Sequence, residues 1–349
     1  MKKTAGFIIV MILIFFFAWA RTEYVQNAFL AADGFAQGTT YHIVVKKTPL
    51  KFFLKKDSSG NLKTQIDSIL DHFDQSLSTY QRESIISRIN RNEPGVTVDT
   101  LFKRVFHVSE EIYRESDGAF DITVAPLVSA WGFGPGGPDE QNNPNIDSLL
   151  RFVGMDKVHL EGASVIKEDT SVRLDVNAIA QGYSVDVVSG FLDDAGYRNY
   201  LVEIGGEIRA RGTKGWNNPW KVGVDKPTDN NFIPGQNLQA ILKLKDKALA
   251  TSGNYRKFYI KNGVKYAHTI NPKTGYPARN RLLSITVIAD ECIYADGYAT
   301  ACMVMGVEKS REFIKSKPGL EAYLVYSGDN GSYLTWESDG FSRYMVEEE

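Results

Sequence analysis

The sequence predicts an α+β fold: a single compact domain with a largely antiparallel sheet and flanking helices, preceded by an N-terminal export or anchor segment. Two patterns carry this prediction. Apolar residues at helical spacing dominate the first half of the chain after that segment, whereas short runs rich in β-forming residues follow one another from residue 199 onward. Because strands seldom alternate with helices, we expect them to pair mainly with antiparallel neighbours.

The first twenty residues have the pattern of an export signal. Lys2 and Lys3 precede an uncharged, apolar stretch over residues 4–20, which Arg21 ends. This stretch reaches only the lower limit of ~17 residues for a membrane span, and the AWA sequence at its end resembles a cleavage site. The chain is therefore divided into a signal peptide or membrane anchor (1–20), a connector (21–37) and one domain (38–349).

Local patterns predict the elements of the domain. Leu62, Ile66 and Phe73 share one face of an amphipathic helix, and Asp99 is a suitable N-cap for a second helix that ends at Asp117-Gly118. Further helices are expected over residues 178–194, 296–304 and 308–315. Strands are expected over residues 39–45, 199–204, 208–212, 220–224, 238–244, 256–260, 264–270 and 282–288, with two closing strands after them.

The composition excludes several classes of protein. The 40 Lys+Arg and 42 Asp+Glu residues give a net charge of −2, so the chain lacks the basic surface of a nucleic-acid binder. The two cysteines, Cys292 and Cys302, cannot form a disulfide framework or a cysteine-rich metal site, and we expect packed thiols. A match to G-x-G-x-x-G at residues 132–137 is rejected because Pro135 and Pro138 prevent the helix that a phosphate loop requires.

Two segments place carboxylates where a ligand could use them. Residues 118–123 (GAFDIT) set an aromatic ring beside a carboxylate, which suits a planar ligand with hydroxyl groups; the alternative is a tight turn with a core phenylalanine. Farther along, a short strand ends at Asp175 and a helix begins near Ala178, so the carboxylate and the free amides could bind a ribose hydroxyl or a phosphate. The alternative is that Asp175 or Asn177 caps the helix.

A third region joins HTINPKTG (residues 268–275) with ADGYAT (295–300). Asp296 and Thr300 lie one helical turn apart, so one face presents a carboxylate and a hydroxyl, hard ligands that suit Mg²⁺. The alternatives are an N-cap aspartate and a threonine bonded to its own helix backbone. His268, on a predicted apolar strand, is either a core histidine or a base.

Together with other segments, these motifs resemble the FAD:protein FMN transferase (ApbE) family. From about Gly38 to Trp336 the chain contains, in the family's order, GTTYHI, STYQRESIISRIN, GAFDITVAPLVSAWGFG, LDVNAIAQGYSVD, IGGEIRARG, HTINPKTG and ADGYATA. The resemblance implies a T-fold-like enzyme on the periplasmic side of an inner membrane that binds FAD and Mg²⁺. It would attach FMN to a threonine of an exported or membrane-bound redox protein and release AMP. No nucleic-acid partner is expected, and the membrane is a partner only if the leader is retained.

The resemblance also implies the site residues. The backbone oxygen of Ala178 and the side chains of Asp296 and Thr300 would hold Mg²⁺, while His268 would take the proton of the acceptor threonine. FAD would contact the motif residues Gln37, Tyr80, Ala119, Phe120, Asp121, Asp175, Gln181 and Ile270.

Two positions depart from the commoner family pattern. Many members carry methionine at the position of Gln37 and lysine at that of Gln181. Gln181 can still hydrogen-bond FAD but brings no positive charge to the phosphates, and Arg256 and Arg279 are candidates to supply it. Two other functions stay open. One is an FAD pyrophosphatase that gives FMN and AMP, with water in place of the threonine; the other is a non-catalytic exported FAD-binding protein.

Overall fold

The computed structural model describes residues 28–47, 59–135, 137, 145–215, 218–227, 235–254, 258–261 and 264–346. The leader (1–20) and the first part of the connector lie outside these residues. Within the described ranges, no helix is both long enough and apolar enough to cross a membrane.

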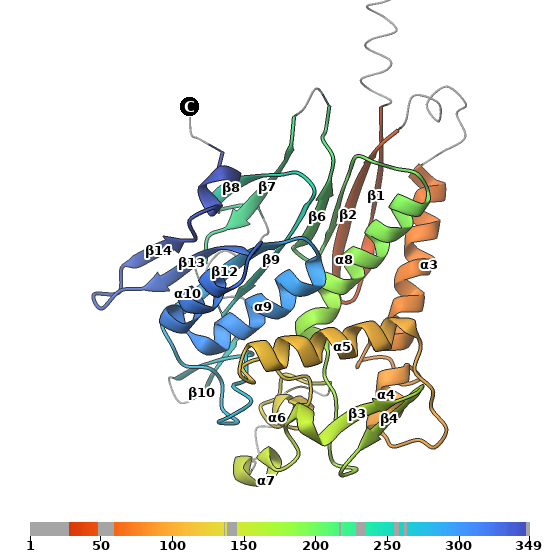
Figure 1. The fold of residues 1–349 in the computed structure, drawn as a ribbon, viewed down its shortest axis with the longest axis vertical. Coiled ribbons are helices and arrows are strands. Elements are labelled where there is room, and N and C mark those ends of the chain that lie inside the picture. The colour runs from red at the N-terminus through yellow and green to blue at the C-terminus, as the bar shows by residue number, and fades with distance from the viewer. Residues whose placement is uncertain are drawn as a thin grey trace, which may run out of the picture.

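An eight-stranded sheet forms the centre of the molecule, in the order β1-β2-β5-β6-β9-β12-β13-β14, and every neighbouring pair is antiparallel (Figure 1). The predicted α+β class and the antiparallel sheet are therefore confirmed. The strands of this sheet are β1 (Phe29–Ala36), β2 (Thr39–Lys46), β5 (Tyr200–Ile204), β6 (Glu207–Arg211), β9 (Lys247–Gly253), β12 (Leu282–Ala289), β13 (Glu321–Ser327) and β14 (Tyr333–Glu337).

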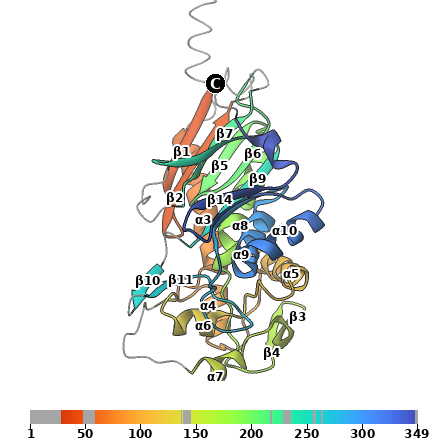
Figure 2. The ribbon, with the colours of Figure 1, turned by 90° about the vertical axis from the view of Figure 1, so that its left-hand side faces the viewer.

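Helices cover one face of this sheet, and a β-hairpin with a short 3₁₀ helix covers part of the other (Figure 2). The helices are α3 (Ser59–Leu77), α4 (Ile85–Asn90), α5 (Thr100–Glu115), α6 (Ala125–Ala130), α7 (Ile146–Leu150), α8 (Asn177–Asp194), α9 (Cys292–Met305) and α10 (Val307–Ser316), with the 3₁₀ turns η1 (Met155–Lys157) and η2 (Phe341–Tyr344). Separate hairpins are β3 (Val158–Glu161) with β4 (Ser164–Lys167), β7 (Trp220–Asp225) with β8 (Leu238–Leu244), and β10 (Phe258–Lys261) with β11 (Val264–Ala267).

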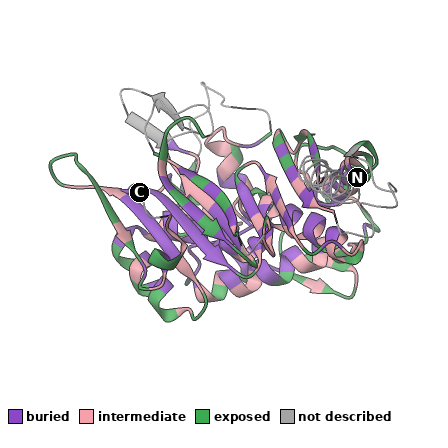
Figure 3. Ribbon diagram, turned by 90° about the horizontal axis from the view of Figure 1, so that it is seen from above, coloured by how far each residue is buried: buried purple, intermediate pink, exposed green. Residues whose placement is uncertain are grey.

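Alternating side chains on the central strands build two cores. Val287 of β12 and Leu324 of β13 join the large core with α5 and α9, whereas Ile288, the next residue of β12, packs under the β7–β8 hairpin. This follows from the two-residue period of a strand, which sends successive side chains to opposite faces. Figure 3 shows that buried residues follow the strands and the helices against them.

The predicted helices are largely confirmed. Asp99 caps α5 by accepting a hydrogen bond from Phe102 N at 2.8 Å, as its position predicts. The helix ends before Asp117 and Gly118, both of which have positive φ angles. α8 begins one residue before its predicted start, but α9 begins at Cys292, four residues before the predicted start at Asp296.

Three elements correct the sequence analysis. β1 lies within residues 21–37, which had been assigned to a connector, and it pairs with β2 through a turn at Gln37 and Gly38. β9 was not predicted at all. The runs over residues 256–260 and 264–270 contribute to a small hairpin outside the main sheet, and β11 ends at Ala267, so His268 lies in a bend and not on a strand. β1 lacks β-branched residues, which explains why its sequence gives no strand signal.

Candidate functional site

The three predicted metal donors lie together where α8 packs against α9. The hydroxyl Oγ1 of Thr300 donates to the backbone oxygen of Ala178 at 3.4 Å, although 122 positions separate the two residues. Asp296, one turn before Thr300, accepts a hydrogen bond at its Oδ2 from Gly182 N at 2.9 Å. A carboxylate, a hydroxyl and a carbonyl, contributed by two helices, therefore meet at one place.

These contacts decide between the alternatives for this region. Because α9 begins at Cys292, Asp296 lies within the helix and is not its N-cap. Thr300 bonds to α8 and not to a carbonyl of its own helix. Gly182 makes the close approach possible, since a Cβ at this position would lie 2.4 Å from Cys292 O.

The charge of Asp296 has little compensation from the protein. Its side chain is buried, and this burial raises its pKa to about 7, against the single opposing hydrogen bond from Gly182 N. The described residues contain no cluster of three or more His, Cys, Asp and Glu side chains that could hold a metal. A buried carboxylate beside a hydroxyl and a carbonyl is nevertheless a set of hard oxygen donors, and this set fits Mg²⁺.

The GAFD and LDVN segments lie side by side. Asp175 N donates to Ile122 O at 2.7 Å, and the side chain of Asn90 bonds both the N and the O of Leu174, at 2.7 and 2.8 Å. Asn90 therefore fixes the short segment that ends at Asp175. Sequence reasoning missed this residue, because its partner is 84 positions away.

Both carboxylates of these segments are buried and bonded to nearby backbone. Asp121 accepts from the N and the Oγ1 of Thr123 at 2.7 and 2.6 Å, and burial raises its pKa to about 6. Asp175 accepts from Asn177 N, the first amide of α8, at 2.8 Å, and burial raises its pKa as well. Val176, and not Asp175 or Asn177, is the N-cap residue of α8, but the Asp175 carboxylate still accepts from the first amide of the helix.

The GAFD turn also has the core phenylalanine of its alternative interpretation. Phe120 is 2% exposed and Ala119 is buried, while Gly118 has a φ of +70°. A ligand at this turn would meet mainly backbone. Tyr80 differs, because it is 66% exposed and lies near Asp175: loss of surrounding water and then the charge of Asp175 raise its pKa.

Of the two glutamines that depart from the family pattern, Gln181 lies on α8, and Gln37, in the β1–β2 turn, contacts this helix. Gln37 accepts a hydrogen bond at its Oε1 from Ser184 Oγ at 3.1 Å, and Gln181 donates through Nε2 to Ile204 O at 3.3 Å. Of the two candidate replacement arginines, Arg279 is exposed and Arg256 lies outside the described residues. Their suggested role stays a prediction.

The HTINPKTG segment forms a loop that is tied to α6. Trp131 Nε1 donates to Gly275 O at 2.7 Å, and Ile270 is buried beside Leu127. His268 is half-buried, and its ring meets Phe133 edge-on with centroids 6.4 Å apart. This loop and the GAFD turn border a hollow of about 660 Å³.

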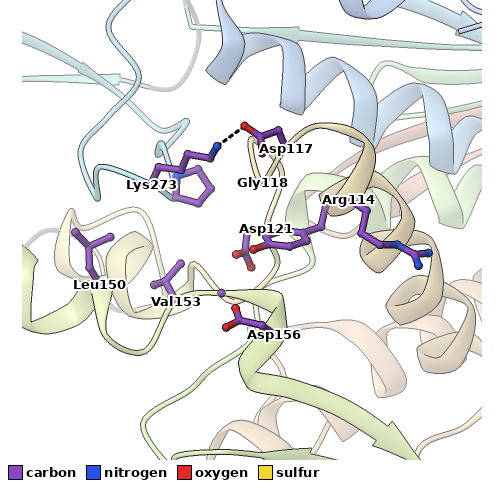
Figure 4. A pocket seen from close by; sticks show the side chains of 11 residues that line it. Arg114, Asp117, Gly118, Asp121, Leu150, Val153, Asp156 and Lys273 are labelled. Atoms are coloured by element: carbon purple, nitrogen blue, oxygen red, sulfur yellow. Dashed lines mark hydrogen bonds and ion pairs between the residues drawn. The ribbon is translucent and has the colours of Figure 1, made fainter. Parts of the chain in front are cut away.

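Figure 4 shows the charged groups of this hollow. Lys273 Nζ is paired with Asp117 at 2.6 Å across its rim, and the buried Asp121 and the exposed Asp156 also line it. The hollow therefore joins two of the motif segments without using the α8–α9 donors.

The known proteins that are similar to this chain include several FAD:protein FMN transferases. The sequence profile of the ApbE family matches residues 37–324. The FAD:protein FMN transferase of Haemophilus influenzae is 34% identical over 98% of both chains, and that of Vibrio cholerae is 34% identical over 90% of this chain and 92% of its own. Among solved structures, the flavin transferase ApbE from Vibrio cholerae superposes with a TM-score of 0.80 at 33% identity, over 90% of this chain and 99% of that one. The apo form of the Pseudomonas stutzeri flavinyl transferase ApbE gives 0.79 at 30% identity, over 90% and 96%.

Proposed function

This chain belongs to the ApbE family and is an FAD:protein FMN transferase; from that premise we propose that its α8–α9 site holds Mg²⁺ and that the group it modifies is a threonine hydroxyl. The observation that carries the metal proposal is the meeting of Ala178 O, Asp296 and Thr300 around a buried, weakly compensated carboxylate. Bound there, Mg²⁺ would neutralise charge on the diphosphate of FAD as AMP departs.

The remaining chemistry falls to protein side chains. In the proposed reaction the acceptor Oγ forms a bond to the FMN phosphorus, the bond between that phosphorus and the bridging oxygen breaks, and AMP leaves with the bridging oxygen. His268 takes the hydroxyl proton, a contribution typically worth ~10²–10⁴ in rate. Tyr80, the GAFD turn and the Asp175 segment would hold FAD; in support, Asp175 N donates to Ile122 O, and Asn177 Nδ2 donates to the hydroxyl of Thr79, the residue before Tyr80.

The decisive experiment is incubation of the protein with FAD, Mg²⁺ and a threonine-bearing redox protein, followed by mass measurement. We expect the acceptor to gain one FMN and AMP to appear in equal amount. Release of FMN and AMP without an adduct would identify a pyrophosphatase instead, and intact FAD would leave only a binding protein.

The role of His268 has its own test. We expect His268→Ala to slow FMN transfer by ~10²–10⁴-fold while FAD binding, measured by flavin fluorescence, is unchanged. A variant that transfers FMN at the normal rate would remove His268 from the reaction.

We also propose that the protein is exported to the periplasmic side of an inner membrane. The support is the basic start at Lys2 and Lys3 and the apolar stretch over residues 4–20. Expression of the full chain, followed by cell fractionation and intact mass, tests this proposal and reports leader cleavage. A full-length chain in the cytosolic fraction would contradict it.

A further inference from the structure

We propose that Asp186 is a positioning residue that sets the geometry of the metal donors by fixing the start of α9 to α8. The inference rests on the proposed Mg²⁺ site. Asp186 closes the LDVNAIAQGYSVD motif, and no role was assigned to it from the sequence.

Asp186 supplies the cap that α9 lacks. The N-cap residue of α9, Glu291, makes no side-chain cap hydrogen bond. Instead, Asp186 reaches across from α8: its Oδ1 accepts from Cys292 N at 3.0 Å and its Oδ2 accepts from Ile293 N at 2.8 Å. Free amides at a helix start need such acceptors, and a negative charge is favourable there.

The same two helices make a ladder of three contacts. Its members recur at every fourth residue of each helix, so each set lies on one helical face. The ladder joins Ala178 to Thr300, Gly182 to Asp296 and Asp186 to Cys292. Numbers rise along α8 as they fall along α9, so the helices are antiparallel. Two of these three contacts involve the proposed metal donors, and Asp186 makes the third.

The ladder has little freedom to adjust. A Cβ on Gly182 would lie 2.4 Å from Cys292 O and 2.6 Å from Asp296 Cβ, so the backbones of the two helices are close. A shift of α9 at its start would therefore move Asp296 and Thr300 relative to Ala178. Metal sites respond to displacements of this kind, because donor positions must be held within about 0.5 Å.

Asp186 is itself held in place from the sheet. Its side chain is 7% exposed, and Arg209 of β6 donates through Nη1 to its Oδ1 at 2.5 Å. The sheet, α8 and α9 are thus joined through one carboxylate. The hydrogen bonds of Asp186 go to Cys292, Ile293 and Arg209 and to none of the three metal donors, so it acts on the metal through the placement of α9.

The test measures Mn²⁺ binding by electron paramagnetic resonance, without FAD, in Asp186→Asn. We expect Mn²⁺ affinity to fall by ~10–100-fold, the range for residues that orient metal ligands. The matched control is Asp193→Asn, which removes an ion pair between α8 and Arg211 of the same strand without touching α9. We expect that control to stay within about twofold of the wild type, since the partners of Asp193, which are Arg211, Arg198 and the Tyr200 hydroxyl, belong to neither α9 nor the proposed metal site.

A transfer assay gives a second readout that a general loss of stability would not move. In Asp186→Asn we expect the Mg²⁺ concentration for half-maximal rate to rise ~10-fold or more, with kcat at saturating Mg²⁺ close to the wild-type value. A folded Asp186→Asn with wild-type Mn²⁺ affinity, or an equal loss in Asp193→Asn, would overturn the proposal.

Folding and the metal site itself are controlled separately. If Asp186→Asn does not fold, Asp186→Asn/Arg209→Gln removes both charges of the pair, which costs less than leaving one buried charge alone. We expect the same weakened Mn²⁺ binding from it, and wild-type affinity would again overturn the proposal. If Asp296→Ala bound Mn²⁺ as tightly as the wild type, the metal site would be the idea that fails.

Discussion

The α8–α9 interface and the rim of the hollow beside Asp121 use charged side chains in opposite ways. At the interface, Asp296 and Asp186 are buried between two regular helices, and each has fixed backbone partners. At the hollow, Lys273 and Asp117 pair across loops, and their side chains are 56% and 96% exposed. The first arrangement holds its carboxylates in fixed, buried positions, whereas water and salt screen the second.

The same residue types therefore have different consequences in the two regions. A carboxylate buried with few partners is unstable alone and is stabilised by a cation, so it suits a metal site. An exposed ion pair on loops costs little to break, so its members can exchange partners when a ligand arrives. We therefore expect substitutions at the interface to have large effects and those at the rim of the hollow to have small ones.

The largest effect is expected at Asp296. Asp296→Ala removes the only carboxylate among the proposed donors and should lower the rate of FMN transfer by ~10²–10⁴-fold, since metal stabilisation of the transition state is worth several kcal/mol. Flavin fluorescence should show FAD binding retained. The matched control is Asp290→Ala, an exposed aspartate just before α9, which should leave transfer unchanged. Normal transfer by Asp296→Ala would contradict the proposed mechanism.

The close approach of the helices is tested at Gly182. Gly182→Ala should lower the free energy of unfolding by ~1–3 kcal/mol, because its Cβ would collide with the backbone of α9. Gly190→Ala, on the same helix but with nothing within 4 Å of its Cβ, should instead raise it by ~0.5–1 kcal/mol. Urea unfolding of the two variants measures both values. Equal changes in the free energy of unfolding for the two variants would show that α8 and α9 can move apart at little cost.

The pH should affect the stability of the α8–α9 interface through Asp296. Burial raises the pKa of Asp296 to about 7 from 3.8, so between these values the folded, metal-free protein holds a proton that the unfolded chain has released. The contribution of Asp296 to the free energy of unfolding therefore falls as the pH rises from about 4 to about 7. Metal binding has the opposite dependence, because only the ionised carboxylate binds.

Mn²⁺ titrations across this range measure that dependence. Below pH 7, affinity should drop about tenfold for each pH unit, as the ionised fraction of Asp296 does. In the metal-free protein, Asp296→Asn should abolish the part of the pH dependence of stability that the Asp296 carboxyl causes. Affinity that is constant from about pH 5 to 7 would show that Asp296 is already ionised without metal.

The smallest effect is expected at the rim of the hollow. Lys273→Ala breaks the pair with Asp117, yet Tm should not change measurably at low or high salt, because both side chains are well exposed. Thermal unfolding at two ionic strengths checks this. A clear decrease in Tm would mean that this loop is as tightly built as the α8–α9 interface.

Much of the site could be predicted from the sequence, because helical spacing and motif order are local. The i, i+4 relation of Asp296 and Thr300 holds in the structure, although the start of α9 was placed too late. The N-cap residue Glu291 makes no side-chain cap hydrogen bond, and the acceptor for the first amides of α9 is Asp186, 106 positions before Cys292, so the true start of α9 depends on a distant residue. β1 was missed for a related reason, since pairing with β2 and not strand propensity defines it.

The sequence by itself determined the class of fold, most of the helices, and which polar residues share a helical face. It did so because periodicity and capping depend on residues a few positions apart. Only the tertiary structure decided that α8 lies antiparallel to α9, that Thr300 contacts Ala178, and that Asp186 of α8 accepts hydrogen bonds from the first amides of α9. Those contacts depend on how two helical faces pack across more than 100 positions of chain, and no local pattern encodes the register in which they meet.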